Sequence, residues 1–125
     1  MFIVGHEYTR DAIHAQLGGS KRACMPTVGG IVVAACLLKA FNPETPQVVL
    51  CGTGPSNGPA GVLLATQREA IPFFTRIATG RWVHEGRFEA AEVLTHGARY
   101  DTHVARSSRE PSSVSRVVLM RLVAA

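Results

Sequence analysis

Apolar residues in this sequence occur in short runs that are separated by turns rich in glycine and proline. The runs cover residues 31–38, 47–51, 71–77, 81–85, 87–94 and 115–123. Valine, isoleucine and phenylalanine are frequent in them, and such β-branched and aromatic residues favour strands. Gly80 and Gly86 separate the three central runs, where each glycine is suited to a tight turn. The pattern therefore predicts six strands.

Two segments have helical spacing instead. Thr9 is suited to cap a helix in which Ile13 and Leu17 share one face, and a glycine pair ends it after about two turns. A second helix is expected after the run 47–51, where Pro59 lies near the first turn. Both helices are short, so they are expected to cover part of a sheet rather than to form a layer of their own.

Residues 95–115 are polar and contain Gly97, Pro111 and five serines, which predicts an irregular connection. The expected fold is therefore α+β: a small, strongly curved β-barrel of about six strands with two short helices. One domain is expected, formed by residues 1–125. A barrel suits this many strands in a short chain because closing the sheet removes exposed strand edges.

The composition indicates a folded chain outside membranes. Hydrophobic residues make up 46% and charged residues 18%, as in globular proteins. All apolar runs are far shorter than the roughly 20 residues that span a bilayer, and the N-terminus lacks the pattern of a secretory signal. A cytoplasmic protein is expected. Cys24, Cys36 and Cys51 lack disulfide or zinc-site spacing, and Cys36 and Cys51 are best interpreted as core residues.

The charge suits a polyanionic partner. Lys and Arg number 13 against 9 Asp and Glu, which gives a net charge of +4. Arg predominates, and its planar fork matches phosphate and guanine geometry. On composition alone, however, the arginine excess is more simply explained by a GC-rich genome.

The glycine-rich loop 52–58 lies between a strand and a helix, where phosphate-binding loops occur. Its spacing matches neither GxGxxG nor a P-loop, and Pro55 and Pro59 remove backbone donors. A structural loop is favoured over a nucleotide site. The histidines lack the spacing of metal ligands, and Glu85, Glu89 and Glu92 are interpreted as a solvated strand face. We therefore expect a binding protein without catalytic residues, metal or cofactor.

Aromatic residues and arginines alternate between residues 71 and 88. Phe74 and Trp82 flank Arg76, and aromatic rings beside arginines suit base stacking combined with phosphate contacts. Taken singly, each aromatic residue is more simply a core residue. The loop after the first helix carries Lys21 and Arg22, which together with Arg10 form a candidate phosphate-binding patch.

Several short motifs together resemble one group of domains. The motifs are Tyr8-x-Arg10, Leu17-Gly-Gly-Ser, Met25-Pro-Thr-Val-Gly-Gly, Val33-Ala-Ala-Cys-Leu, Asn42-Pro, Leu50-Cys-Gly-Thr-Gly-Pro, Gln67-Arg-Glu, Ile71-Pro-x-Phe74, Trp82-x-x-x-Gly86 and Val114-x-Arg116-Val-Val. The chain thereby resembles the PUA-like domains, related to SRA and EVE domains, that read modified DNA beside HNH nucleases in bacterial restriction and defence systems.

This resemblance implies a curved barrel that holds a flipped, modified base of double-stranded DNA. The implied base pocket comprises Tyr8, Ser20, Arg22, Phe74 and Trp82. The implied phosphate contacts are Arg10, Lys21, Arg76 and Arg116. The segment Arg22, Cys24, Met25 departs from the neutral-polar and aromatic character expected there.

The expected function is thus recognition of modified DNA by a reader domain, with cleavage left to a separate nuclease. An RNA-binding PUA-like or EVE-like module is the nearer alternative. A small nucleotide-binding enzyme that uses the loop 52–58 is the more distant one.

Overall fold

The computed structural model describes residues 1–124, which form eight strands, three α-helices and a 3₁₀ turn. In chain order the elements are β1 (Glu7–Tyr8), α1 (Arg10–Leu17), β2 (Thr27–Val28), β3 (Ile31–Val32), β4 (Ala35–Leu37), β5 (Val48–Cys51), α2 (Gly54–Thr66), β6 (Ile71–Ala78), β7 (Arg81–Leu94), α3 (Ala98–Arg106), the turn Pro111–Ser113 and β8 (Arg116–Ala124). The expected α+β class is confirmed, although the strand and helix counts are higher than predicted.

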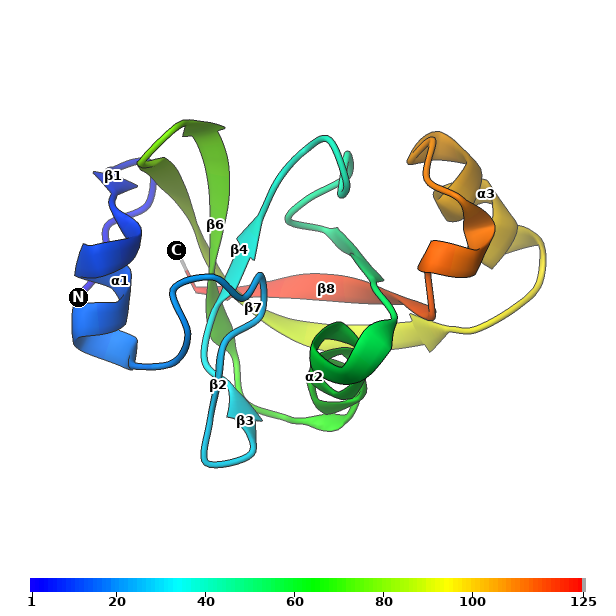
Figure 1. Cartoon of the computed structure of the whole chain (residues 1–125), viewed down its shortest axis with the longest axis horizontal. Helices are drawn as coiled ribbons and strands as arrows, with labels where there is room; N and C mark the ends of the chain where they lie inside the picture. The colour runs from blue at the N-terminus through cyan, green and yellow to red at the C-terminus, as the bar shows by residue number, and fades with distance from the viewer. Residues whose placement is uncertain (125) are drawn as a thin grey trace.

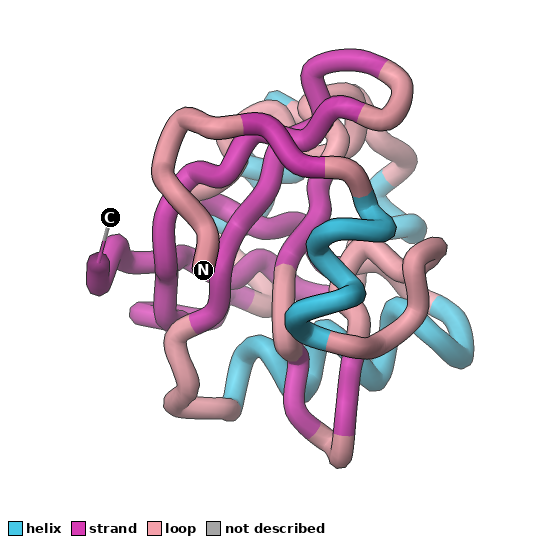
Figure 2. Tube along the Cα trace, turned by 90° about the vertical axis from the view of Figure 1, so that its left-hand side faces the viewer, coloured by secondary structure: helices cyan, strands magenta, loops and turns pink. Residues whose placement is uncertain are grey.

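One strongly curled sheet organises the chain (Figures 1 and 2). Its strands follow the order β4-β6-β7-β8-β5, and β1 adds to β7. All neighbours are antiparallel except β4 and β6, which run parallel. Because β4 and β5 are the two ends of this order, the sheet is a half-barrel with an open side rather than a closed barrel.

The inner face of the sheet and helix α2 enclose the largest core cluster. Phe73, Val49 and Val118 are at most 1% exposed in this cluster, and Leu64 of α2 packs against them. The side chains come from alternate positions of each strand, as expected because successive residues point to opposite faces. Burying this apolar surface is the main force that curls the sheet around α2.

Two smaller clusters lie where α1 and α3 pack. Ile13 of α1 packs against Phe74 and Trp82, while Val104 of α3 packs against Leu50 and Val117. Figure 1 shows these two helices at opposite ends of the molecule, with α2 between them. The sheet is therefore covered in patches, and its open side lies between the helices.

Helix α1 forms as the sequence predicts. The Thr9 hydroxyl oxygen accepts a hydrogen bond from the Ala12 amide at 3.1 Å, which is an N-cap. Gly18 follows the last residue with φ of 76°, and its amide donates to the His14 carbonyl at 2.9 Å. These two caps position Arg10 in the first turn, next to the sheet.

The structure corrects three details of the predicted elements. The runs 81–85 and 87–94 are one strand, β7, whose first half pairs with β6 and whose second half pairs with β8. Gly86 therefore marks a bend and not a turn. With φ of 122°, a Cβ there would lie 3.0 Å from Leu122 Cδ1, which explains the glycine.

The run 31–38 divides between two partners, because β3 turns back on β2 while β4 joins β6. Helix α3 occupies part of 95–115, the predicted irregular connection, where Val104 and Tyr100 bury one face of an otherwise polar helix. The glycine, proline and serines of residues 95–115 favoured an irregular connection, so the narrow apolar stripe of α3 was not recognised in the sequence.

Candidate functional site

A cavity of about 280 Å³ occupies the open side of the half-barrel, between the two edge strands. Cys36 and Leu37 of β4 line one side, and Val49 and Leu50 of β5 line the other. The remaining lining residues are Cys24, Met25, Leu38, Phe41, Asn42, Gly52, Asn57 and Arg109. We call this space the gap cavity. Its volume is slightly below the range of about 300–1,000 Å³ that is usual for ligand pockets.

Side chains satisfy the backbone of β5 along the gap cavity. The Leu50 amide donates to Asn42 Oδ1 at 2.8 Å, and the Leu50 carbonyl accepts from Arg109 Nη1 at 3.0 Å. The same Nη1 donates to the Phe41 carbonyl at 3.2 Å. An unpaired edge strand would recruit another strand. Asn42 and Arg109 therefore keep the half-barrel open without leaving this part of the edge unpaired.

The segment Cys24–Met25 forms the wall beside β4. The Cys24 carbonyl accepts from the Cys36 amide at 2.7 Å, and the Cys24 thiol donates to Asn57 Oδ1 at 3.6 Å. Burial raises the pKa of the Cys24 thiol, although the nearby Arg10 and Arg109 oppose the shift. A neutral thiol is a weak nucleophile. The wall therefore offers polarizable and hydrogen-bonding contacts suited to binding.

The polar side chains that line the gap cavity are few, and Asn42 Oδ1, Asn57 Oδ1 and the Arg109 guanidinium already make hydrogen bonds within the fold. Asn42 and Asn57 supply carboxamides, Arg109 a guanidinium and Cys24 a thiol. Carboxamides both donate and accept, as the edge of a nucleobase does.

The sequence-predicted aromatic residues lie together on the sheet face under α1. Tyr8 and Trp82 are directly paired across β1 and β7, and Arg76 pairs with Trp82 from β6. The ring centroids of Tyr8 and Phe74 are 6.1 Å apart, and Phe2 lies 5.0 Å from each. Residues far apart in the sequence thus form one aromatic cluster.

This aromatic cluster is tightly packed. Phe74 is 0% exposed and Trp82 is 8% exposed. A base could contact Phe74 only after Phe2, Tyr8 or another covering residue moved, because these side chains already enclose the ring. Tyr8 Oη accepts from the Ile3 amide at 2.8 Å, which fixes the N-terminal segment over the cluster. A direct role of Tyr8, Phe74 and Trp82 in base binding stays a prediction.

Arg10 covers the exposed side of the cluster. Its Cζ lies 5.0 Å from the Trp82 ring centroid, within the range of a cation–π contact. Arg10 Nη2 donates to the Ala23 carbonyl at 2.7 Å and to the Ser20 carbonyl at 3.3 Å. Nε donates to His14 Nε2 at 3.0 Å. The guanidinium predicted to contact phosphate therefore ties the basic loop to the sheet.

The loop between α1 and β2 carries the remaining basic candidates. Lys21 Nζ lies 2.7 Å from Asp11 Oδ1, with both side chains largely exposed. Arg22 is exposed, and its amide donates to the Ser20 hydroxyl at 3.2 Å. Lys21 holds the pKa of Asp11 below its usual value through a hydrogen bond. An exposed pair of this kind contributes little stability, so Lys21 is free to exchange Asp11 for a phosphate.

Two further arginines were predicted to contact phosphate. Arg76 is half-buried, and its Nη2 donates to the Thr79 hydroxyl at 3.0 Å. Arg116 begins β8 on the side of α3, away from α1 (Figure 1). Its Nε is buried and without a hydrogen-bond partner among residues 1–124. The structure therefore groups Arg76 with the α1 region and sets Arg116 apart.

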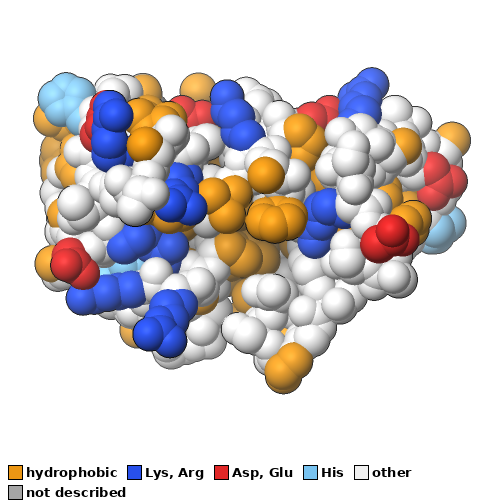
Figure 3. Space-filling view, turned by 45° about the horizontal axis from the view of Figure 1, so that its top comes forward, with side chains coloured by type: hydrophobic (Ala, Val, Ile, Leu, Met, Phe, Trp, Pro, Cys, Tyr) orange, Lys and Arg blue, Asp and Glu red, His pale blue; other side chains and the backbone are white. Residues whose placement is uncertain are grey.

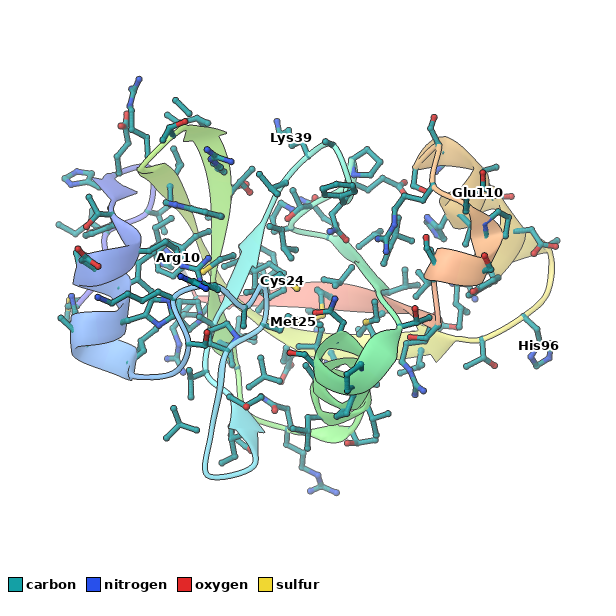
Figure 4. All side chains as sticks on the ribbon, viewed as in Figure 1. Arg10, Cys24, Met25, Lys39, His96 and Glu110 are labelled. Atoms are coloured by element: carbon teal, nitrogen blue, oxygen red, sulfur yellow. The ribbon has the colours of Figure 1, made fainter. Side chains whose placement is uncertain are left out.

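The molecular face that contains the open side of the half-barrel carries basic side chains next to a depression. Figure 3 shows Lys and Arg side chains gathered over its left part and hydrophobic side chains exposed in a depression beside them. Figure 4 shows Lys39 at the top of the loop between β4 and β5, with Glu110 beyond it near α3. Basic groups are thus most concentrated on one flank of the open side.

Sequence reasoning missed the residues that shape the gap cavity. In the sequence Asn42 stands out only as part of the short motif Asn42-Pro, and Arg109 lies in the predicted irregular connection 95–115. Asn42 is buried, with 7% of its surface exposed, but an asparagine before a proline is typical of an exposed turn. The sequence therefore carried no signal of its burial. Arg109 reaches Leu50 from 59 positions away in the chain, and such a contact is invisible before folding.

Within residues 1–124, His, Cys, Asp and Glu side chains do not gather in groups of three that could bind a metal ion. Every helix in the same range is too short or too polar to cross a membrane.

Comparisons with protein-family models, with curated proteins and with solved structures find no match to this chain.

Proposed function

We propose that this chain binds modified DNA and holds one flipped base in the gap cavity, without catalysing a reaction. The observation that carries the proposal is the gap cavity itself, an apolar space whose lining includes two carboxamides, a thiol and a guanidinium, beside a basic flank. Enzymes and readers that inspect a single base place it in such a pocket and bind its polar edge. The resemblance to PUA-like readers supports the same function.

The basic loop supplies the phosphate contacts in this proposal. Lys21 and Arg22 are exposed, and the loop that carries them runs directly into Cys24 and Met25 of the cavity wall. A DNA backbone held by Lys21 and Arg22 would therefore pass close to the cavity mouth. Arg76 is assigned the same role from the neighbouring β6, through the part of its side chain that is exposed.

The aromatic cluster has a supporting role. Trp82 packs in one cluster with Tyr8 and Phe74, Arg10 lies over the Trp82 ring, and Arg10 donates hydrogen bonds to the Ser20 and Ala23 carbonyls. The packed rings thereby fix the loop that contacts DNA. Cleavage of bound DNA is left to a separate nuclease of a restriction or defence system.

Binding titrations test the proposal. Duplexes with 5-methylcytosine, 5-hydroxymethylcytosine or N6-methyladenine are compared with the unmodified duplex and with RNA of the same sequence, each at several salt concentrations. We expect affinity to fall with salt and to be higher for at least one modified duplex. Equal affinity for all DNA probes would refute modification reading, and preference for RNA would favour an RNA-binding module.

Matched variants locate the contacts. Lys21→Ala and Arg22→Ala should each reduce the slope of log affinity against log salt by about 1. Arg121→Ala removes an equally exposed, ion-paired arginine on β8, and we expect an unchanged slope. Asn57→Ala should reduce the preference for modified DNA, because it removes a carboxamide from the cavity wall.

A further inference from the structure

An exposed aromatic ring lies at the rim of the gap cavity. Phe41 is 54% exposed and lines both the gap cavity and a second, shallower hollow next to it. Phe74 and Phe73, by contrast, are 0% exposed. The Phe41 ring thus presents free apolar surface at the place where a base would enter.

The backbone that carries Phe41 is held firmly. The amides of Phe41 and Asn42 both donate to the Leu38 carbonyl, at 3.0 and 2.9 Å. Arg109 donates to the Phe41 carbonyl at 3.2 Å, and buried Asn42 anchors the loop to β5 through Leu50. A ring presented by a fixed backbone loses little conformational freedom when it binds.

The connection between β4 and β5 is also attached to α3, at Glu44, which follows Phe41 in the chain. Glu44 Oε1 accepts from Arg106 at 2.9 Å, and Glu44 Oε2 lies 2.7 Å from His103 Nδ1. Although burial raises the pKa of Glu44, the hydrogen bonds from His103 and Arg106 keep it below its usual value. The loop is therefore fixed on both sides of Phe41, while the ring and the exposed Lys39 project outward.

We propose that Phe41 stacks on a nucleobase next to the flipped one, and that Lys39 contacts the adjoining phosphate. Every base presents a flat π face, so an exposed ring at the cavity mouth suits stacking regardless of sequence. Apolar side chains that enter between base steps also hold a distorted duplex open. This inference rests on the proposed function and adds a second contact site to it.

The test uses the full chain and a duplex with 5-methylcytosine followed by 2-aminopurine, whose fluorescence changes on stacking. Phe41→Ala should weaken binding by about 5- to 150-fold, since that is the contribution of one base–aromatic stack. Phe41→Trp should retain affinity, and Lys39→Ala should lower the salt dependence. Leu122→Ala is the matched control, because Leu122 is 55% exposed and belongs to β8. Circular dichroism checks that each variant is folded.

The outcomes separate the two proposals. If the wild-type chain does not bind DNA in a salt-dependent manner, the proposed function fails and this inference fails with it. If the wild-type chain binds but Phe41→Ala binds equally well, with the same 2-aminopurine signal, only the stacking role is overturned. An equal loss in Leu122→Ala would also overturn it, since the effect would not be specific to the cavity mouth. Loss in Phe41→Ala with retention in Phe41→Trp supports the inference.

Discussion

The guanidinium of Arg10 lies over the indole ring of Trp82, with Arg10 Cζ 5.0 Å from the ring centroid. The same guanidinium donates to the Ala23 carbonyl at 2.7 Å, in the segment that leads to the cavity wall. The Trp82 ring and the loop are thus joined through one side chain. A residue that resembles a phosphate ligand in the sequence is an internal support in the fold.

Replacing Arg10 tests this role. Arg10→Ala should lower the free energy of unfolding by about 2 kcal/mol, because hydrogen bonds from a charged group and a cation–π contact are lost together. Arg10→Lys should recover less than half of this loss, since an ammonium cannot reproduce the planar fork. Urea denaturation measures both values. Unchanged stability with weakened DNA binding would instead identify Arg10 as a phosphate ligand.

Asn42 should be important for stability although it lies in a loop. Asn42→Ala removes the acceptor of the Leu50 amide at a position that is 7% exposed. Leaving a buried donor unpaired costs about 1–3 kcal/mol. Thermal unfolding should show the loss, whereas Gln47→Ala, at an exposed position of the same connection, should have little effect. Equal effects of the two changes would contradict the role assigned to Asn42.

Phe74 should behave as a core residue. Phe74→Ala should destabilise the fold by about 3–5 kcal/mol, as truncation of a buried phenylalanine does. Phe74→Leu should cost less, because it keeps most of the apolar volume. Denaturation at neutral pH measures both changes. A stable Phe74→Ala variant with altered ligand affinity would support the direct pocket role that the sequence analysis expected.

Stability should fall in mildly acidic solution because of His84. His84 is 2% exposed, and burial lowers its pKa, although a hydrogen bond with the Phe73 carbonyl partly opposes the shift. The unfolded chain therefore binds the proton more readily than the folded chain. The free energy of unfolding has its full value above the unfolded pKa of about 6.5, and it declines as the pH falls from there to the lower pKa of the folded state.

His84→Asn isolates this effect. Melting temperatures measured between pH 8 and pH 5 should decline on acidification for the wild-type chain and less steeply for the variant. His96→Asn is a suitable control because His96 is exposed. Glu44 titrates below this range, since the hydrogen bonds from His103 and Arg106 lower a carboxyl pKa that is ordinarily already acidic. Parallel curves for wild type and His84→Asn would disprove the assignment.

Local sequence patterns determined most of the elements. Thr9 and Gly18 fixed the ends of α1 because a hydroxyl cap and a left-handed glycine act within one turn of backbone. The apolar runs 47–51 and 115–123 predicted β5 and β8 closely, since all four residues of β5 are buried and Val117, Val118 and Met120 of β8 are buried as well. The α+β class and the curled sheet followed from these elements.

The gap cavity was decided by tertiary structure. The sequence assigned Gly86 to a turn, whereas pairing with both β6 and β8 makes it a bend within β7. It also directed attention to Phe74, which packing encloses, and away from Arg109, which reaches Leu50 across the fold. Propensity and spacing act over a few residues, but a cavity depends on which distant side chains fill or frame the space between two strand edges. That information arises only when the chain is folded.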